Sequence, residues 1–170
     1  MDLCAYNPRV LGTPRLKNDG DSDVISLLLS NTRGLIETAV GLQVRDEHEL
    51  CFRFPRFFPA LPIEGYVFPP VFHPNVDPET GFACLWARSS PGDTMVEALV
   101  RIQKVISWAG YNVQSRHVLQ PKALCWLNAT ERAWDLPLSA IPIALPEGLL
   151  PRPANFHQAS GRRRIVAEES

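Results

Sequence analysis

The chain has 170 residues, of which 45% are hydrophobic and 21% are charged, and its formal net charge is −1. This length and composition predict one soluble domain with a substantial core. The near-zero net charge gives no electrostatic reason to expect nucleic acid or a membrane as a partner. No apolar run reaches the roughly 18 residues that a membrane-spanning helix needs.

The four cysteines, Cys4, Cys51, Cys84 and Cys125, are spread along the sequence without a C-x-x-C pair. The first residues do not form a basic segment followed by an apolar run of signal-peptide length. Disulfide-stabilised domains are usually smaller and richer in cysteine. We therefore expect free thiols and a cytoplasmic protein.

The first third of the chain predicts a meander of strands after a broken N-terminal segment. Prolines and glycines lie among charged residues in 1–23, which allows a short helix at most. The apolar run at 24–30, the segment 35–44 and the alternating "ELCFRF" at 49–54 predict three antiparallel strands, with turns at "NTRG" and "RDEH" between them.

The next segment, 55–78, contains seven prolines in 24 residues. Proline at this density excludes a helix and allows only edge or short strand pairing. Aromatic and aliphatic side chains are interspersed among the prolines, whereas a flexible linker would lack such side chains. The segment is therefore expected to be extended but ordered.

Two helices follow. Residues 92–109 have Asp93 or Thr94 as a cap and apolar residues at helical spacing along one face. Residues 121–134 predict a second helix, since proline suits a first helical turn. The sequence thus divides into an N-terminal segment (1–23), a central domain (24–134) and a proline-rich extension (135–170). We expect part of the extension to lie extended over the domain or a partner and its basic end to be a mobile tail.

The stretch "VFHPNVDPETGFACLW" at 71–86 concentrates the candidate chemistry, with a His-Pro-Asn triplet ahead of Cys84. Cys84 is a candidate nucleophile, because a thiolate can form and release an acyl bond; the alternative is a buried core thiol. The amide of Asn75 could donate to a developing oxyanion, or could bond the local backbone as a turn residue. Both roles remain open.

Three further residues complete the candidate site. His73 and Pro74 are expected to support the active-site loop structurally. In the loop after the first long helix, His117 could accept a proton near neutral pH as a general base, although a loop histidine can also be simply solvated. Arg116 beside it could bind a carboxylate or lower the thiol pKa.

Several of these features, in this order, resemble the ubiquitin-conjugating (UBC) family. They are the strand meander, a strand ending "FRFP", the stretch "FFPALP", the motif "PPVFHPN", a cysteine followed by Leu85 and Trp86, and then a helix. The later "YNVQSRHVLQPKALCWL" is similar to prokaryotic members. The resemblance covers roughly 24–134; the N-terminal helix is shortened, the C-terminal region is atypical, and the loop before Cys84 is about one residue longer than usual, a difference that Gly81 would absorb.

The resemblance implies an α+β fold in which an antiparallel four-stranded meander packs on a central helix. It also implies a transferase that accepts a ubiquitin-like protein, or another protein's C-terminus, as a thioester on Cys84 and passes it to an amine. The implied partners are an adenylating, ATP-using activating enzyme and, as substrate, a ubiquitin-like protein or a cyclic-nucleotide synthase in a bacterial antiviral defence pathway. The oligomeric state is not indicated.

Two other functions fit the same residues. A cysteine hydrolase could use Cys84, His73 and Asn75 to cleave protein conjugates, since such constellations hydrolyse acyl bonds on other folds. A non-catalytic UBC-like module could only bind a partner, although the cysteine at the motif position argues against this. Zinc spacing patterns are absent from the sequence, so we expect no metal and no cofactor.

Overall fold

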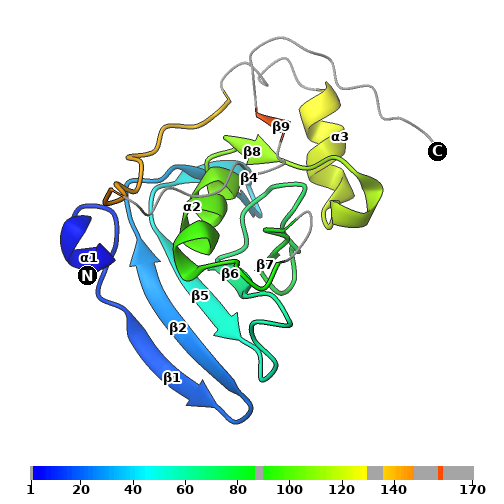
Figure 1. Cartoon of the computed structure of the whole chain (residues 1–170). Coiled ribbons are helices and arrows are strands. Elements are labelled where there is room, and N and C mark those ends of the chain that lie inside the picture. Colours follow the sequence, from blue (N-terminus) through cyan, green and yellow to red (C-terminus); the bar gives the residue numbers. More distant parts are fainter. Residues whose placement is uncertain (1, 87–89, 130–135, 148–156, 159–170) are drawn as a thin grey trace.

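The computed structural model describes residues 2–86, 90–129, 136–147 and 157–158. Its helices are α1 (Leu3–Tyr6), α2 (Met95–Ile106) and α3 (Pro121–Ala129), with a 3₁₀ turn η1 (Ser115–His117). Its strands are β1 (Arg15–Asp19), β2 (Ser22–Leu29), β3 (Gly34–Thr38), β4 (Gly41–Arg45), β5 (His48–Phe54), β6 (Glu64–Phe68), β7 (Phe82–Ala83), β8 (Gly110–Tyr111) and β9 (His157–Gln158). The described residues thus form an α+β fold (Figure 1).

The main sheet is antiparallel, with five strands in the order β1-β2-β5-β6-β7. The family resemblance implied a four-stranded meander. β1 was not expected, because it lies in the segment 1–23, for which the sequence predicted a short helix at most. It pairs with β2 from Arg15↔Ser26 to Asp19↔Ser22, so this segment contributes both α1 and the edge of the sheet.

The sequence predicted that the segment 35–44 forms one strand beside β2, and this prediction is wrong. The segment folds into the separate hairpin β3–β4, in which Thr38 is paired with Gly41. The Thr38 hydroxyl closes the turn by donating to the Gly41 carbonyl at 2.8 Å and accepting from the Val40 amide at 3.3 Å. β2 pairs instead with β5, because both strands direct apolar side chains to the same side of the sheet.

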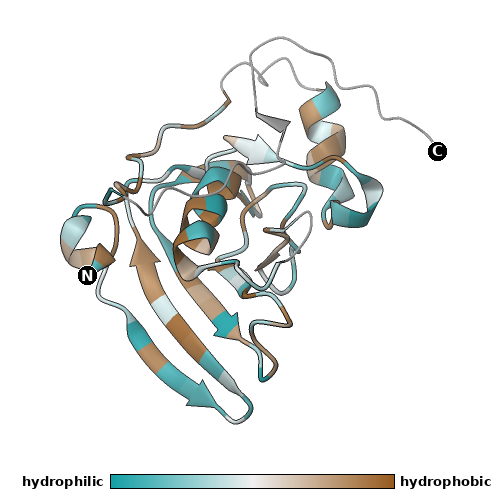
Figure 2. Cartoon of the chain, viewed as in Figure 1, coloured by the Kyte–Doolittle hydropathy of each residue, from teal (hydrophilic) through white to brown (hydrophobic). Residues whose placement is uncertain are grey.

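α2 packs on that side and buries the main core. Its N-terminus has a complete capping box, in which Thr94 accepts from the Glu97 amide and the Glu97 side chain accepts from the Thr94 amide. Figure 2 shows the hydrophobic residues of β2 and α2 against a largely hydrophilic β1. The buried core contains Leu27, Leu29, Leu50, Phe52, Val67, Ala98, Leu99, Ile102, Val105 and Ile106. The helix predicted at 92–109 is confirmed at 95–106.

A second, smaller core lies where α2 ends. Trp108 takes a left-handed conformation (φ 58°) and is fully buried. Its ring packs against His73 at 4.7 Å and Trp126 of α3 at 5.6 Å between centroids. This aromatic contact joins α3 to the segment that carries the His-Pro-Asn triplet. The helix predicted at 121–134 is confirmed for 121–129, and the rest lies outside the described residues.

The described part of the extension, 136–147, crosses the domain in an extended conformation, as the sequence predicted. The Leu138 amide donates to the Ser107 carbonyl, and the Ile141 amide donates to the Asn31 carbonyl. Gln103 of α2 donates to the Ile141 carbonyl at 2.8 Å and accepts from the Ile143 amide at 3.2 Å. The basic tail "GRRR" lies outside the described residues.

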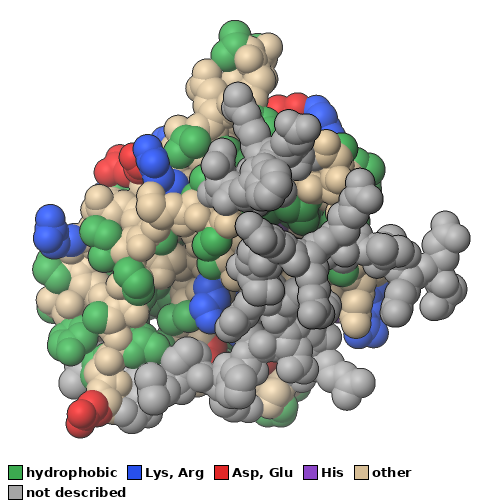
Figure 3. Space-filling model, turned by 90° about the horizontal axis from the view of Figure 1, so that it is seen from above, with side chains coloured by type: hydrophobic (Ala, Val, Ile, Leu, Met, Phe, Trp, Pro, Cys, Tyr) green, Lys and Arg blue, Asp and Glu red, His purple; other side chains and the backbone are tan. Residues whose placement is uncertain are grey.

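Two general expectations can be compared with the described residues. Their helices include none long and apolar enough to cross a membrane. On the face of the molecule seen in Figure 3, lysine and arginine side chains are scattered among hydrophobic and acidic ones instead of gathering on one element.

Candidate active site

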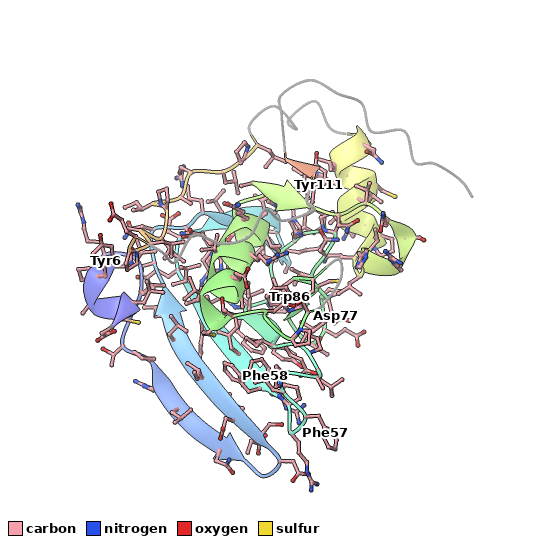
Figure 4. The ribbon with its side chains drawn as sticks, in the orientation of Figure 1. Tyr6, Phe57, Phe58, Asp77, Trp86 and Tyr111 are labelled. Carbon is pink, nitrogen blue, oxygen red and sulfur yellow. The ribbon has the colours of Figure 1, made fainter. Side chains whose placement is uncertain are left out.

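The His-Pro-Asn triplet and Cys84 face each other across a hairpin. The Cys84 amide donates to the Asn75 carbonyl at 2.8 Å, and the Asp77 amide donates to the Phe82 carbonyl at 2.8 Å. Val76 and Ala83 form the bridge between these bonds. The hairpin is held to the sheet through β7, which pairs with β6. Figure 4 labels Asp77, which lies within this hairpin, and Trp86, which follows it in the chain.

The loop that closes this hairpin is ordered by Asp77 and Gly81. The Asp77 carboxylate accepts from the amides of Glu79 and Thr80 at 2.9 and 2.8 Å, and these bonds hold the pKa of that carboxyl below its ordinary value. Gly81 has φ +74°, and a Cβ there would collide with the carbonyl oxygen of Val67. Glycine at position 81 therefore allows both this loop conformation and its close approach to β6.

The side chain of Asn75 is fully buried and all its main hydrogen-bonding capacity is used. Its Nδ2 donates to the carbonyls of Asn112 at 2.7 Å and His117 at 2.8 Å, and its Oδ1 accepts from the Asn112 amide at 2.7 Å. An amide with both N–H groups engaged has none left for an oxyanion. Of the two predicted roles, this geometry fits the organising role, and it does not fit donation to an oxyanion.

His73 and Pro74 also support the loop. The His73 amide donates to the Gln120 side chain at 2.8 Å, and the Pro74 carbonyl accepts from the amides of Leu119 and Gln120. His73 Nδ1 accepts from the Asn75 amide at 3.1 Å. Burial lowers the pKa of His73 to about 3, so the ring is neutral and enclosed. Because Asn75 and His73 are both committed to the backbone, the hydrolase constellation of Cys84, His73 and Asn75 is not assembled.

The histidine that meets the thiol is His117. Its Nδ1 lies 3.2 Å from Sγ of Cys84, and Arg116 donates from Nε to His117 Nε2 at 3.0 Å. Burial raises the pKa of the Cys84 thiol, and a hydrogen bond with the Trp86 backbone acts in the opposite direction. Burial, followed by the positive charge of Arg116, lowers the pKa of His117. Cys84 itself is half-buried.

Trp86 and Arg101 form one side of this region. The Trp86 indole donates to the Ile63 carbonyl at 2.8 Å, and the Arg101 guanidinium lies 4.7 Å from the centroid of the Trp86 ring. Arg101 also donates to the Leu85 carbonyl at 3.3 Å. These contacts hold Leu85 and Trp86, the two residues that follow Cys84, in place. An open hollow between the β1–β2 turn and Phe58 contains none of the predicted site residues in its lining.

The sequence identified Cys84, Asn75, His117, His73 and Pro74 as site residues, and the structure brings all five into one cluster. It missed Asn112, whose backbone is the main partner of Asn75. No sequence signal could have found it, because main-chain groups carry no residue signature. Within the described residues, no group of three or more His, Cys, Asp or Glu side chains is placed to hold a metal ion.

Comparison with protein-family models and with curated proteins finds no match to this chain. The assignment of function therefore depends on the site and on the family resemblance.

Proposed function

We propose that the chain is a diverged, prokaryotic UBC-type transferase that carries a protein C-terminus as a thioester on Cys84. The observation that carries the proposal is the position of Cys84. The residue is half-buried, it is held opposite Asn75 in a hairpin, and its sulfur contacts one histidine. A covalent relay needs a sulfur that is held in place and that an acyl group can reach, and a half-buried cysteine in a hairpin is consistent with this need.

The reaction consists of two acyl transfers. In the first, the Cys84 thiolate attacks the activated C-terminal carbonyl of the donor, a C–S bond forms, the donor's leaving group departs, and the thiol proton passes to solvent. In the second, an amine attacks the thioester carbonyl, a C–N bond forms, and the C–S bond breaks. The thiolate is regenerated and the ammonium proton passes to solvent. Neither step requires a metal or a redox cofactor.

The family resemblance supplies the partners in this proposal. An ATP-using, adenylating enzyme would activate the donor, and the donor would be a ubiquitin-like protein or the C-terminus of a cyclic-nucleotide synthase. The five-stranded sheet on α2 is compatible with a UBC-like fold, in which the short α1 and the extended 136–147 segment replace longer helices. A role in bacterial antiviral defence rests on the resemblance alone.

A hydrolase remains the second candidate, because Cys84 and His117 make the direct contact that cysteine hydrolases use. The two functions differ in the acceptor. A transferase forms a thioester that persists until an amine arrives, whereas a hydrolase passes the acyl group to water. The lifetime of the thioester therefore separates them.

A synthetic peptide with a C-terminal thioester tests the proposal without the activating enzyme. Intact mass should show one peptide added to the protein, removed by dithiothreitol, and lysine added to the reaction should yield the peptide–lysine amide. Cys84→Ala should abolish the adduct, whereas the control variants Cys51→Ala and Cys125→Ala should retain it. Free peptide acid released over many turnovers without an adduct would support the hydrolase, and an adduct that persists in Cys84→Ala would overturn the assignment of the nucleophile.

A further inference from the structure

The His117 ring lies between the sulfur of Cys84 and the positively charged guanidinium of Arg116. Nδ1 lies 3.2 Å from Sγ of Cys84, and Nε2 lies 3.0 Å from the donating Nε of Arg116. The guanidinium is itself oriented by Gln114, whose Oε1 accepts from Arg116 Nη2 at 3.1 Å. Arg116 is exposed, while His117 is largely buried. The contact with Arg116 therefore reaches the sulfur only through the histidine.

The chemistry of arginine determines which ring nitrogen carries the proton. A guanidinium has donors only and stays protonated throughout the range in which proteins fold. Nε2 of His117 must accept its N–H, so in the neutral ring the proton is on Nδ1. The doubly protonated ring would set an N–H group against the N–H of Arg116 beside a positive charge. Burial and the charge of Arg116 accordingly hold the pKa of His117 below its ordinary value.

We propose that Arg116 is a positioning residue that fixes His117 in its Nδ1–H form, so that His117 donates a hydrogen bond to the sulfur of Cys84. In this proposal His117 acts as a hydrogen-bond donor and not as the general base that the sequence suggested. A donor at this place stabilises the thiolate, both as it attacks a carbonyl and as it leaves one. That the thiolate is used in acyl transfer rests on the proposed function. The hydrogen bonds from Arg116 to His117 and from His117 to Cys84 do not depend on that function.

The arrangement also bears on the choice between transfer and hydrolysis. A hydrolase needs a ring nitrogen that can take a proton from water beside the acyl group. In His117 the nitrogen facing Cys84 already carries a proton, and the other nitrogen is occupied by Arg116. The same pair of contacts that stabilises the thiolate thus removes the base that would discharge a thioester to water.

The tautomer can be read directly in the full-length protein labelled with ¹⁵N-histidine. At pH 7.5, the ¹⁵N shifts of His117 should show a protonated Nδ1 and an unprotonated Nε2. In Arg116→Met they should move toward the Nε2–H form, and the pKa of His117 should rise. Arg15→Met removes an exposed arginine on β1 and should change neither. An Nε2–H ring in the wild type, or an unchanged ring in Arg116→Met, would overturn the proposal.

The donor role is tested by two substitutions of His117. Asparagine can place an N–H close to the position of Nδ1 but has no basic nitrogen, whereas leucine has neither. The alkylation rate of Cys84 by iodoacetamide, followed by peptide mass against pH, reports the thiol pKa. His117→Asn should keep the wild-type midpoint, and His117→Leu should raise it by about one to two pH units. Equal shifts in both variants would mean that the basic nitrogen matters and would overturn the proposal.

These measurements need no acyl donor, so they can fail independently of the proposed function. If the tautomer and the thiol pKa are as expected but no peptide adduct forms, the transferase function is wrong and the proposed Arg116–His117–Cys84 arrangement is supported. If the adduct forms but the His117 ring is in the Nε2–H form, the transferase function is supported and the proposed arrangement is wrong. Melting curves of the His117 variants confirm that the thiol is compared in folded protein.

Discussion

The Cys84 amide donates to the Asn75 carbonyl at 2.8 Å, while the side chain of Asn75 donates to the carbonyl of His117 at 2.8 Å. One asparagine therefore holds both segments whose side chains meet at the sulfur. Its main chain positions Cys84, and its side chain positions the turn that carries His117. Asn75 therefore helps to set the distance between Cys84 and His117, together with the bonds of His73 and Pro74 to Leu119 and Gln120.

Asn75→Ala should destabilise the protein by at least about 2 kcal/mol, because it leaves two carbonyls and one amide buried without their partner. Loss of thermal stability and slower peptide-thioester formation at Cys84 should appear together. Asn18→Ala is a matched control, since Asn18 makes one exposed bond to Asp23, and should change stability by less than about 0.5 kcal/mol. A stable Asn75→Ala variant that forms the thioester normally but transfers it slowly to lysine would restore the oxyanion role.

Gly81→Ala should cost more stability than Gly20→Ala, although both residues have positive φ values of 74° and 64°. An alanine in this region costs about 1–2 kcal/mol from backbone strain alone. The Gly20 position has open space, so only this strain applies there, whereas at Gly81 the new Cβ also meets the carbonyl of Val67. Urea unfolding of the two variants measures the difference. Equal losses would show that the loop can move away from β6 without penalty.

Stability should fall as the pH drops below about 6.5, because His73 is neutral when folded. Burial lowers its pKa to about 3 in the folded state, so between about 6.5 and 3 the unfolded chain binds a proton that the folded chain does not. One such group changes the free energy of unfolding by about 1.4 kcal/mol per pH unit within this window. Urea titrations at pH 7.5, 5.5 and 4.5 measure the slope.

His48 and His117 contribute in the same direction, since burial also lowers their pKa values. His73→Asn isolates the contribution of His73, because asparagine can still accept from the Asn75 amide without titrating, and it should reduce the slope in this window. Asp77, whose pKa is lowered by the Thr80 and Glu79 amides, loses its contribution only at lower pH, as its carboxyl protonates. A His73 ring that titrates near pH 6.5 in folded protein would contradict the assignment.

Gln103→Ala should loosen the segment 136–147 while leaving the sheet intact. The Gln103 side chain bonds Ile141, Ile143 and the Thr32 hydroxyl, and these bonds hold the segment across α2. Limited proteolysis with mass detection should show earlier cleavage within 138–145 in this variant. Lys104→Ala, on the same helix, should give the wild-type pattern. Unchanged protection in Gln103→Ala would mean that the main-chain bonds to Asn31 and Ser107 are sufficient.

The sequence by itself determined the local elements. The helix at 95–106 was predicted from its apolar spacing and from a cap at Asp93 or Thr94, and the structure has Thr94 as the cap. β2 and β5 were visible as apolar or alternating runs. Gly81 was expected at a turn of the loop before Cys84, and it has a positive φ there. Each of these depends on bonds or strain within a few residues, so the local sequence carries the necessary information.

Tertiary structure decided which of these elements meet. The pairing of β2 with β5 across the β3–β4 hairpin depended on the shared packing surface of α2, which no single segment reveals. Asn75 bonds the carbonyls of residues 37 and 42 positions later, and Cys84 meets a histidine 33 positions later. A carbonyl is the same group in every residue, so the partners of Asn75 have no sequence signature. In our proposal, the ring nitrogen of His117 that carries the proton is set by the position of Arg116, and this position exists only in the folded η1 turn.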